Sequence, residues 1–232
     1  MNSPIAILGA LEAEIEALKG AMQDCKAVSW QQTTFYEGLL FGQRVVLAQS
    51  GVGKVMSAMV TQKIIDTYQP RYLLFTGVAG GLTSYYNIGD IVIAKDCVQH
   101  DMDAMGLGFP RGQVPYTEYR FLATDPKLRA LALTTRTAHP LHEGRILTGD
   151  HFMTKKEVHD YRYLTEELAG DAVEMEGASV GLVCTYNQVP FLIIRTLSDK
   201  ANDDANVNFL EFLPVVAANS FAVIEHMLTQ LD

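Results

Sequence analysis

The sequence predicts an α/β fold, a three-layer α/β/α sandwich around a central mixed, mostly parallel sheet. Short apolar runs alternate with segments of helical spacing along the chain. The apolar runs are near-continuous, as strands buried on both faces require. Alternation of strand and helix patterns is typical of sheets that helices cover on both sides.

The first half of the chain supplies five of the predicted strands. Residues 5–11 form a near-continuous apolar run, and residues 12–22 follow with Ile15, Leu18 and Met22 at helical spacing. The strand at 72–76 is expected to end at a glycine cluster, residues 77–81. In chain order we expect strands at 5–11, 34–41, 44–49, 72–76 and 90–98, and helices at 12–22 and 54–68.

The second half begins with a long segment, residues 106–124, that is rich in Gly, Pro and aromatic residues. We expect a loop, because loops of this length are usually functional or mobile. Pro126 suits the first turn of a helix, and Pro214 is expected to bend the last one. The remaining strands are expected at 145–148, 172–175 and 191–197, and the helices at 126–136, 155–168, 177–186 and 209–231.

Length and composition favour one domain, residues 1–232. A chain of 232 residues with 48% hydrophobic residues can bury a sizeable core, and no internal repeat or linker interrupts it. The net charge of −9 disfavours non-specific binding to nucleic acid or to an anionic membrane.

The cysteines and the N-terminus indicate a cytoplasmic protein. Cys25, Cys97 and Cys184 are widely separated, which suits free thiols in a reducing compartment, and no Cys/His metal spacing appears. The first residues lack the basic and apolar regions of a signal peptide. We also expect no membrane helix, because no stretch approaches the roughly 18 apolar residues that one needs.

Acidic residues follow five of the predicted strands. In sheets of this kind, ligands bind beyond the carboxyl ends of the strands. One carboxylate at such an end is most simply a helix cap, whereas five acidic ends on one side indicate a site. The residues concerned are Glu12, Glu14, Asp101, Asp103, Asp150, Glu174, Glu176 and Asp199.

The segment 173–177 carries two glutamates inside an apolar stretch. If the strand continues through it, Glu174 and Glu176 lie on the same face. A carboxylate in that position can accept hydrogen bonds from the vicinal hydroxyls of a sugar. Alternatively, both glutamates belong to the first turn of the next helix. The spacing leaves these alternatives open.

Two glycine-rich segments, residues 50–54 and 77–81, lack the spacing of phosphate-binding or dinucleotide-binding loops. Tight turns account for both. His100 with Asp101 and Asp103 could be read as metal ligands, but no further residue with ligand spacing lies nearby. We therefore expect neither a metal nor a cofactor.

Taken together, eight short motifs resemble the 5′-methylthioadenosine/S-adenosylhomocysteine nucleosidases of the purine nucleoside phosphorylase superfamily. The resemblance covers nearly the whole chain. It implies a nucleoside phosphorylase-like fold and hydrolysis of the N-glycosidic bond of both nucleosides, by protonation of N7 and water attack at C1′. The motifs lie at residues 9–14, 50–54, 76–81, 89–92, 100–101, 149–150, 173–176 and 195–199.

The resemblance also implies roles for three carboxylates. Asp199 matches the acid that protonates adenine N7, Glu14 the base that activates water, and Glu176 the group that holds the ribose hydroxyls. The chemistry calls for these types independently, because adenine leaves poorly unless protonated and the sugar becomes oxocarbenium-like. A partly desolvated carboxylic acid can serve as the acid at neutral pH.

Further residues are implied to contact the substrate. Phe152 matches a ring that stacks on adenine, and Met153 a residue that offers backbone groups to the base edge. Leu107 and Phe109 match a segment, 106–116, that a homodimer partner supplies to the neighbouring site. The other implied substrate-binding residues are Met175, Val52, Leu11, Val78, Ser198 and Phe209.

Departures from the family favour water over phosphate as the nucleophile. Val78 stands where relatives often carry a serine, and Phe75 where bacterial phosphorylases place a phosphate-binding arginine. Leu11 replaces a frequent methionine, a near-isosteric change. Gly177 stands where an alanine is common.

Two rival functions remain open at this point: a phosphorolytic purine nucleoside phosphorylase and a non-catalytic nucleoside-binding protein. The 5′ group of the substrate is also open, with 5′-deoxyadenosine and aminofutalosine as further candidates. The resemblance implies a role in methionine salvage.

Overall fold

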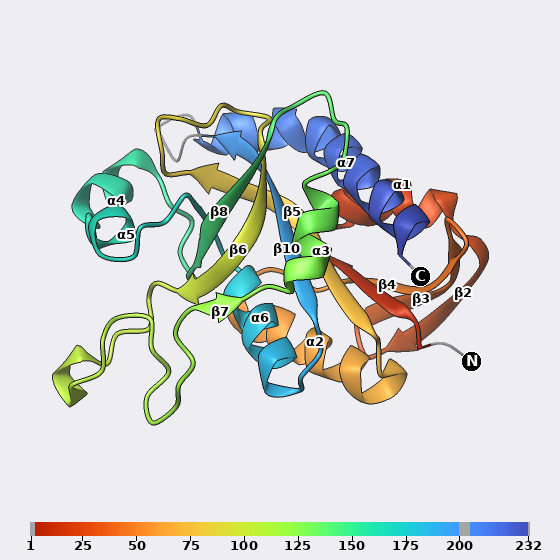
Figure 1. The fold of residues 1–232 in the computed structure, drawn as a ribbon, viewed down its shortest axis with the longest axis horizontal. Coiled ribbons are helices and arrows are strands. Elements are labelled where there is room, and N and C mark those ends of the chain that lie inside the picture. The colour runs from red at the N-terminus through yellow and green to blue at the C-terminus, as the bar shows by residue number, and fades with distance from the viewer. Residues whose placement is uncertain (1–2, 200–204, 232) are drawn as a thin grey trace.

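The computed structural model describes residues 3–199 and 205–231, except for the side chains of residues 155–157 and 205–211. It confirms the α/β fold class, because helices pack on both faces of one large mixed sheet (Figure 1). The sheet order is β10-β6-β8-β9-β5-β1-β4-β3-β2, and β7 pairs with β6. The strands are β1 Ile5–Gly9, β2 Gln23–Trp30, β3 Thr33–Leu40, β4 Gln43–Gln49, β5 Tyr72–Gly81, β6 Ile91–Gln99, β7 Leu122–Ala123, β8 Leu141–Thr148, β9 Ala172–Glu174 and β10 Phe191–Asp199.

The centre of the sheet is parallel. Strand β1 lies between β4 and β5, and β5 also pairs in parallel with β10. Since β5 pairs antiparallel with β9 as well, the strands β10, β6, β8, β9 and β5 form a closed circuit. This closure brings the carboxyl ends of β5, β9 and β10 to one place.

Two groups of helices cover the two faces (Figure 1). On one face, α1 and α3 pack against α7; on the other, α2 packs against α6. Short helical segments complete the chain near the site and in the long loop. The helices are α1 Glu12–Ala21, α2 Lys54–Tyr68, α3 Pro126–Ala132, α4 Lys155–Asp160, α5 Tyr163–Glu166, α6 Gly177–Tyr186, α7 Ala205–Gln230 and the 3₁₀ turn η1 Met105–Leu107.

Strand β1 shows why the sheet is buried on both faces. All five of its residues are buried. Ile5 and Ile7 belong to the apolar cluster under α1 and α7, while Ala6 and Leu8 belong to the cluster under α2 and α6. Side chains alternate across a strand, so a continuous apolar run supplies both clusters at once.

Helix α7 differs from the expectation that no stretch of the chain is apolar enough to cross a membrane. By length and composition alone, residues 212–230 could cross a membrane, with a mean hydropathy of 1.4. The packing of this helix gives a physical reason for its composition, because Val223, Ile224, Met227 and Leu228 are buried in the cluster beneath it. Pro214 lies inside the helix.

Three corrections concern strands. Strand β2 was not predicted, because most of its residues are exposed and it pairs with β3 at the edge of the sheet without an apolar face. Strand β5 does not end at Thr76 but continues through the glycine cluster to Gly81, where it pairs with β9. Strand β8 begins at Leu141, whereas the strand was predicted from residue 145.

Two predicted helices are shorter than expected. The helix predicted at 126–136 ends at Ala132, where the hydroxyls of Thr134 and Thr135 donate to the carbonyls of Leu131 and Ala132. The helix predicted at 155–168 divides into α4 and α5. The break brings the rings of Tyr161 and Tyr163 to 5.6 Å, and residues two apart in a continuous helix do not face each other.

Candidate active site

A cavity of about 320 Å³ opens at the carboxyl ends of β1, β5, β9 and β10. Its size is in the range of small-molecule sites. Ten of the residues expected from the sequence line it: Glu14, Asp199, Glu176, Met175, Phe152, Met153, Val52, Leu11, Val78 and Ser198. Glu174, one of the acidic residues expected at the strand ends, lines it as well, and the lining residues that were not expected are Ala10, Ala79, Gly80, His151, Val173 and Arg195.

Glu14 is held at the inner wall of this cavity by backbone groups. It lies in the first turn of α1 and is 2% exposed. Its Oε2 accepts a hydrogen bond from the Leu11 N–H at 2.9 Å, and its Oε1 accepts one from the Val78 N–H at 3.2 Å. Burial raises the pKa of Glu14, while these donors and the charge of Arg195 oppose the rise.

The glycine cluster in β5 allows this close approach. A β-carbon on residue 77 would lie 2.8 Å from Oε1 of Glu14, closer than side chains tolerate. Glycine at position 77 therefore lets the strand pass directly behind the carboxylate. The cluster, for which a tight turn was expected, is instead part of strand β5 and lies in close contact with a carboxylate.

Glu176 lies at the N-cap of α6 and is 6% exposed. Its Oε1 accepts a hydrogen bond from the Gly53 N–H at 2.8 Å, and Gly53 has a φ of +89°, which favours glycine. Burial, reinforced by the negative charge of Glu174, raises the pKa of Glu176 to about 8. Glu176 therefore carries a proton more often than an exposed glutamate does at neutral pH.

Strand β9 ends at Glu174, so Glu174 and Glu176 are not the alternating residues of one strand. Glu174 forms an ion pair with Arg195, with Nη2 and Oε2 2.7 Å apart. It also accepts the Gly177 N–H at 2.7 Å and the Thr148 hydroxyl, and so caps α6. Hence Glu174 has a partner for its charge, which separates its role from that of Glu176.

Arg195 was missed because a fully buried arginine within an apolar strand gives no periodic signal. It is 1% exposed on β10, and its guanidinium lies 4.1 Å from the ring centroid of Phe75. Phe75 stands where the resemblance places an arginine in phosphorylases. It does not line the cavity but is a buried core residue that packs against Arg195.

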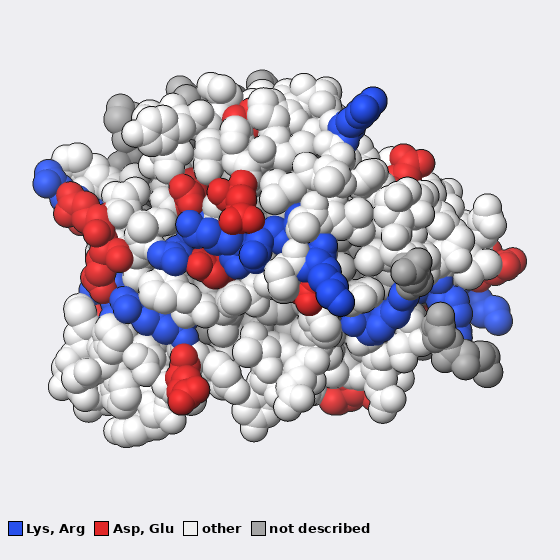
Figure 2. Space-filling model, viewed as in Figure 1, with Lys and Arg blue, Asp and Glu red and all other residues white. Residues whose placement is uncertain are grey.

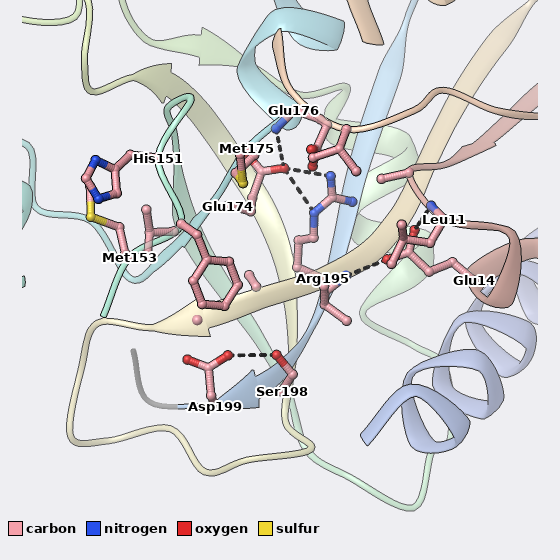
Figure 3. Close-up of a pocket in the computed structure, with 17 residues that line it drawn as sticks. Leu11, Glu14, His151, Met153, Glu174, Met175, Glu176, Arg195, Ser198 and Asp199 are labelled. Atoms are coloured by element: carbon pink, nitrogen blue, oxygen red, sulfur yellow. Dashed lines mark hydrogen bonds and ion pairs between the residues drawn. The ribbon is translucent and has the colours of Figure 1, made fainter. Parts of the chain in front are cut away.

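Asp199 ends β10 and is 4% exposed. The Ser198 hydroxyl donates to its Oδ2 at 2.8 Å. In Figure 3, Asp199 and Ser198 lie on the side of the cavity opposite Glu176, and Glu14 lies between these two ends on the inner wall. Carboxylates from α1, β10 and the start of α6 thus face one space.

The mouth of the cavity is apolar and more exposed. Val52 is 51% exposed and Phe152 is 41% exposed, whereas Met153 is buried. Leu107 and Phe109 do not line this cavity. Phe209 falls in the part of α7 whose side chains lie outside the described residues.

Charge in the cavity disfavours a bound anion. Among its lining residues, Arg195 is the cationic side chain, and its charge is paired with Glu174. The described residues hold no group of three or more His, Cys, Asp or Glu side chains that could bind a metal. Away from the cavity, Figure 2 shows positive and negative side chains interleaved across one face of the molecule. Some charged residues form ion pairs, such as Arg145 with Asp96 and Arg129 with Glu143.

Comparisons with known proteins agree over the whole length. The sequence pattern of the phosphorylase superfamily matches residues 4–229. A 5′-methylthioadenosine/S-adenosylhomocysteine nucleosidase of Colwellia psychrerythraea is 38% identical over 233 aligned positions, which cover 97% of this chain and 95% of the relative.

Solved structures agree as well. The nucleosidase of Neisseria meningitidis, in complex with methylthio-immucillin-A, superposes with a TM-score of 0.93 at 37% identity, covering 99% of this chain and all of the other. The Colwellia psychrerythraea nucleosidase with adenine gives 0.92 at 35% identity, covering 100% and 96%. Futalosine hydrolase of Helicobacter pylori gives 0.91 at 33% identity, covering 99% and 98%.

Proposed function

The chain belongs to the phosphorylase superfamily and is a 5′-methylthioadenosine/S-adenosylhomocysteine nucleosidase, and we propose that Asp199, Glu14 and Glu176 carry its reaction. Each of the three carboxyl groups has a separate role. The enzyme hydrolyses the N-glycosidic bond of 5′-methylthioadenosine and S-adenosylhomocysteine and releases adenine. One observation carries the proposal: besides Glu174, which is paired with Arg195, three buried carboxylates from separate elements face the same cavity.

In the proposed mechanism, Asp199 gives a proton to N7 of adenine, so that the base leaves as a neutral molecule. Its orientation is set by the Ser198 hydroxyl. Phe152 stacks on the base at the mouth, and Met153 presents backbone groups to the base edge. Val52, Leu11 and Val78 supply apolar walls.

Glu14 removes a proton from the water that attacks C1′. A carboxylate whose pKa is raised by burial is a stronger base than one in solvent, and its negative charge favours the positive sugar. Glu176 binds the ribose hydroxyls with Met175 packed beside the sugar. With a pKa of about 8, Glu176 can donate one hydrogen bond as well as accept others.

Water is the favoured nucleophile because the cavity suits no phosphate. The negative charge of Glu14 would repel an anion, and the charge of Arg195 is paired with Glu174. Adenine release measured with and without phosphate tests this. We expect equal rates and a free sugar product, whereas strict dependence on phosphate would show a phosphorylase.

A second candidate substrate is aminofutalosine, and the likeness to futalosine hydrolase of Helicobacter pylori favours it. It shares the adenosine part and differs at the 5′ side. Measuring kcat/KM for methylthioadenosine, S-adenosylhomocysteine, 5′-deoxyadenosine and aminofutalosine side by side ranks the substrates, since that ratio defines specificity.

We further propose a homodimer in which residues 106–116 complete the partner's cavity. Apolar side chains on α2 and η1 support it, since Val55 is 76% and Leu107 67% exposed. Light scattering on Val55→Lys should show a monomer with reduced kcat/KM. A wild-type monomer of full activity would contradict the dimer.

For cell location we propose the cytoplasm, supported by the three free cysteines. For pathway we propose methionine salvage, supported by the methylthio group of the substrate. Fractionation of the producing cells tests the location.

A further inference from the structure

Three charged residues link the two loops at the mouth of the cavity. Lys54 begins α2, Asp101 follows β6, and Asp150 follows β8. Nζ of Lys54 lies 2.7 Å from Oδ1 of Asp101 and 3.9 Å from Oδ2 of Asp150. None of the three lines the cavity.

Backbone groups complete the connection. The Lys54 N–H donates to Oδ1 of Asp150 at 2.8 Å, and the Asp150 N–H donates to Oδ2 of Asp101 at 3.0 Å. The Asp101 carboxylate therefore holds groups from both loops, while the Asp150 carboxylate holds the backbone and the side chain of Lys54. The two aspartates and the lysine form one network, which we name the clasp.

The clasp lies directly beside groups that face the substrate. Gly53, next to Lys54, donates its N–H to Glu176, and a β-carbon on residue 53 would lie 3.1 Å from Oδ1 of Asp150. Val52 lies on the same loop, and Phe152 lies two residues beyond Asp150. The ribose side and the base side of the mouth thus meet at the clasp.

We propose that Lys54, Asp101 and Asp150 are positioning residues that hold the loops 50–54 and 149–153 in the binding geometry before substrate arrives. The inference rests on the binding roles proposed above for Glu176 and Phe152. A protein whose binding-competent state is only partly populated binds with a proportionally weaker apparent affinity. The clasp keeps that fraction high.

This role affects binding more than chemistry. Glu14 and Asp199 come from α1 and β10, which the clasp does not contact through any of its described hydrogen bonds. Saturating substrate would reorder the loops and restore the rate. Loss of the clasp should therefore raise KM and leave kcat nearly unchanged.

The test compares Lys54→Met, Asp101→Asn and the double variant with wild type, using methylthioadenosine. We expect each single variant to raise KM about tenfold with kcat within about threefold, and the double variant to be no worse than the stronger single one, as coupled residues behave. Lys54→Arg should recover part of the loss. The proposal would be overturned by an unchanged KM in Lys54→Met, or by a KM in the double variant that rises by the product of the two single effects.

A matched control is Glu143→Gln, which breaks an ion pair with Arg129 of similar length, 2.8 Å, away from the cavity. It should leave KM unchanged, and an equal rise in KM there would show that the clasp variants act through general stability. Salt provides a second readout, because the clasp is partly exposed and methylthioadenosine is uncharged. The wild-type KM should rise with ionic strength and that of Lys54→Met should not; equal salt dependence would overturn the proposal.

Phe152→Leu separates this inference from the function on which it rests. If KM rises in Phe152→Leu but not in Lys54→Met, the binding role stands and the clasp is wrong. If KM stays at the wild-type value in Phe152→Leu, the proposed base contact is itself wrong.

Discussion

The inner wall of the cavity and its mouth are built differently. The inner wall consists of strand ends and the first turn of α1, and it carries Asp199 and Glu14, both nearly fully buried and held by backbone or hydroxyl hydrogen bonds. The mouth consists of loops, where Val52 and Phe152 are about half exposed. Groups on buried strand and helix ends are held precisely enough for proton transfer, whereas loops can open for entry and release. We therefore expect changes in the wall to lower kcat and changes in the mouth to raise KM.

The largest effect is expected from Asp199→Asn. Its amide cannot protonate N7, so kcat should fall by about 10⁴-fold, the upper end for a general acid. The fold should persist, because the new side chain is isosteric and can still contact Ser198. Adenine release and circular dichroism check the two parts, and wild-type turnover would show that another group is the acid.

Glu14→Gln should lower kcat by about 10³-fold, because an amide cannot accept the proton of the attacking water. Adenine binding should survive, since the base is expected beside Asp199 at one end of the cavity. Calorimetry with adenine and steady-state rates measure both. Full activity in this variant would remove Glu14 as the base.

Gly77→Ala tests whether catalysis needs the close contact between strand β5 and the Glu14 carboxylate. The new β-carbon would meet Oε1 of Glu14 at 2.8 Å and displace it, so we expect kcat to fall by about 10- to 100-fold. Gly20→Ala on α1 is the control, because no atom lies within 4 Å of its added β-carbon. Equal kcat in the two variants would mean that the wall tolerates movement.

At the mouth, Phe152→Leu should raise KM about tenfold and change kcat by less than about threefold, because base stacking contributes to binding in the ground state and the transition state alike. Phe121→Leu is a matched control, since Phe121 is 38% exposed and does not line the cavity. A large fall in kcat for Phe152→Leu would erase the contrast between wall and mouth.

The last prediction concerns the stability of the fold and its dependence on pH, not the rate of the reaction. Glu176 has a pKa of about 8 in the folded protein against 4.5 when unfolded, so between these values the folded state holds the extra proton. The free energy of unfolding should therefore fall as pH rises from about 4.5 to about 8, by at most about 1.4 kcal/mol per pH unit from this group. Above pH 8 this contribution becomes constant.

Glu176→Gln should remove that part of the slope, as urea unfolding at pH 5.5 and pH 8 can measure. Glu225→Gln, on the exposed side of α7, should keep the wild-type slope. A slope unchanged in Glu176→Gln would place the raised pKa on another group.

The fold was predictable where burial leaves a local pattern. The bounds of strand β1 and helix α2 were predicted to within a few residues. A strand buried on both faces needs a continuous apolar run, and a helix buried on one face needs apolar residues at helical spacing. Strand β2 lacks such a pattern, since its stability comes from pairing with β3, and it was missed. The break between α4 and α5, beside which the rings of Tyr161 and Tyr163 lie together, leaves no local pattern in the sequence either.

For the site, the sequence by itself determined which side chains are available and, through motifs in order, the family. Only the tertiary structure decided how they are used. It pairs Glu174 with Arg195, places Glu14 against Gly77, and joins Lys54 to Asp101 and Asp150. These contacts join residues far apart in the chain, and their energies depend on distance and burial, which no local pattern of residues encodes.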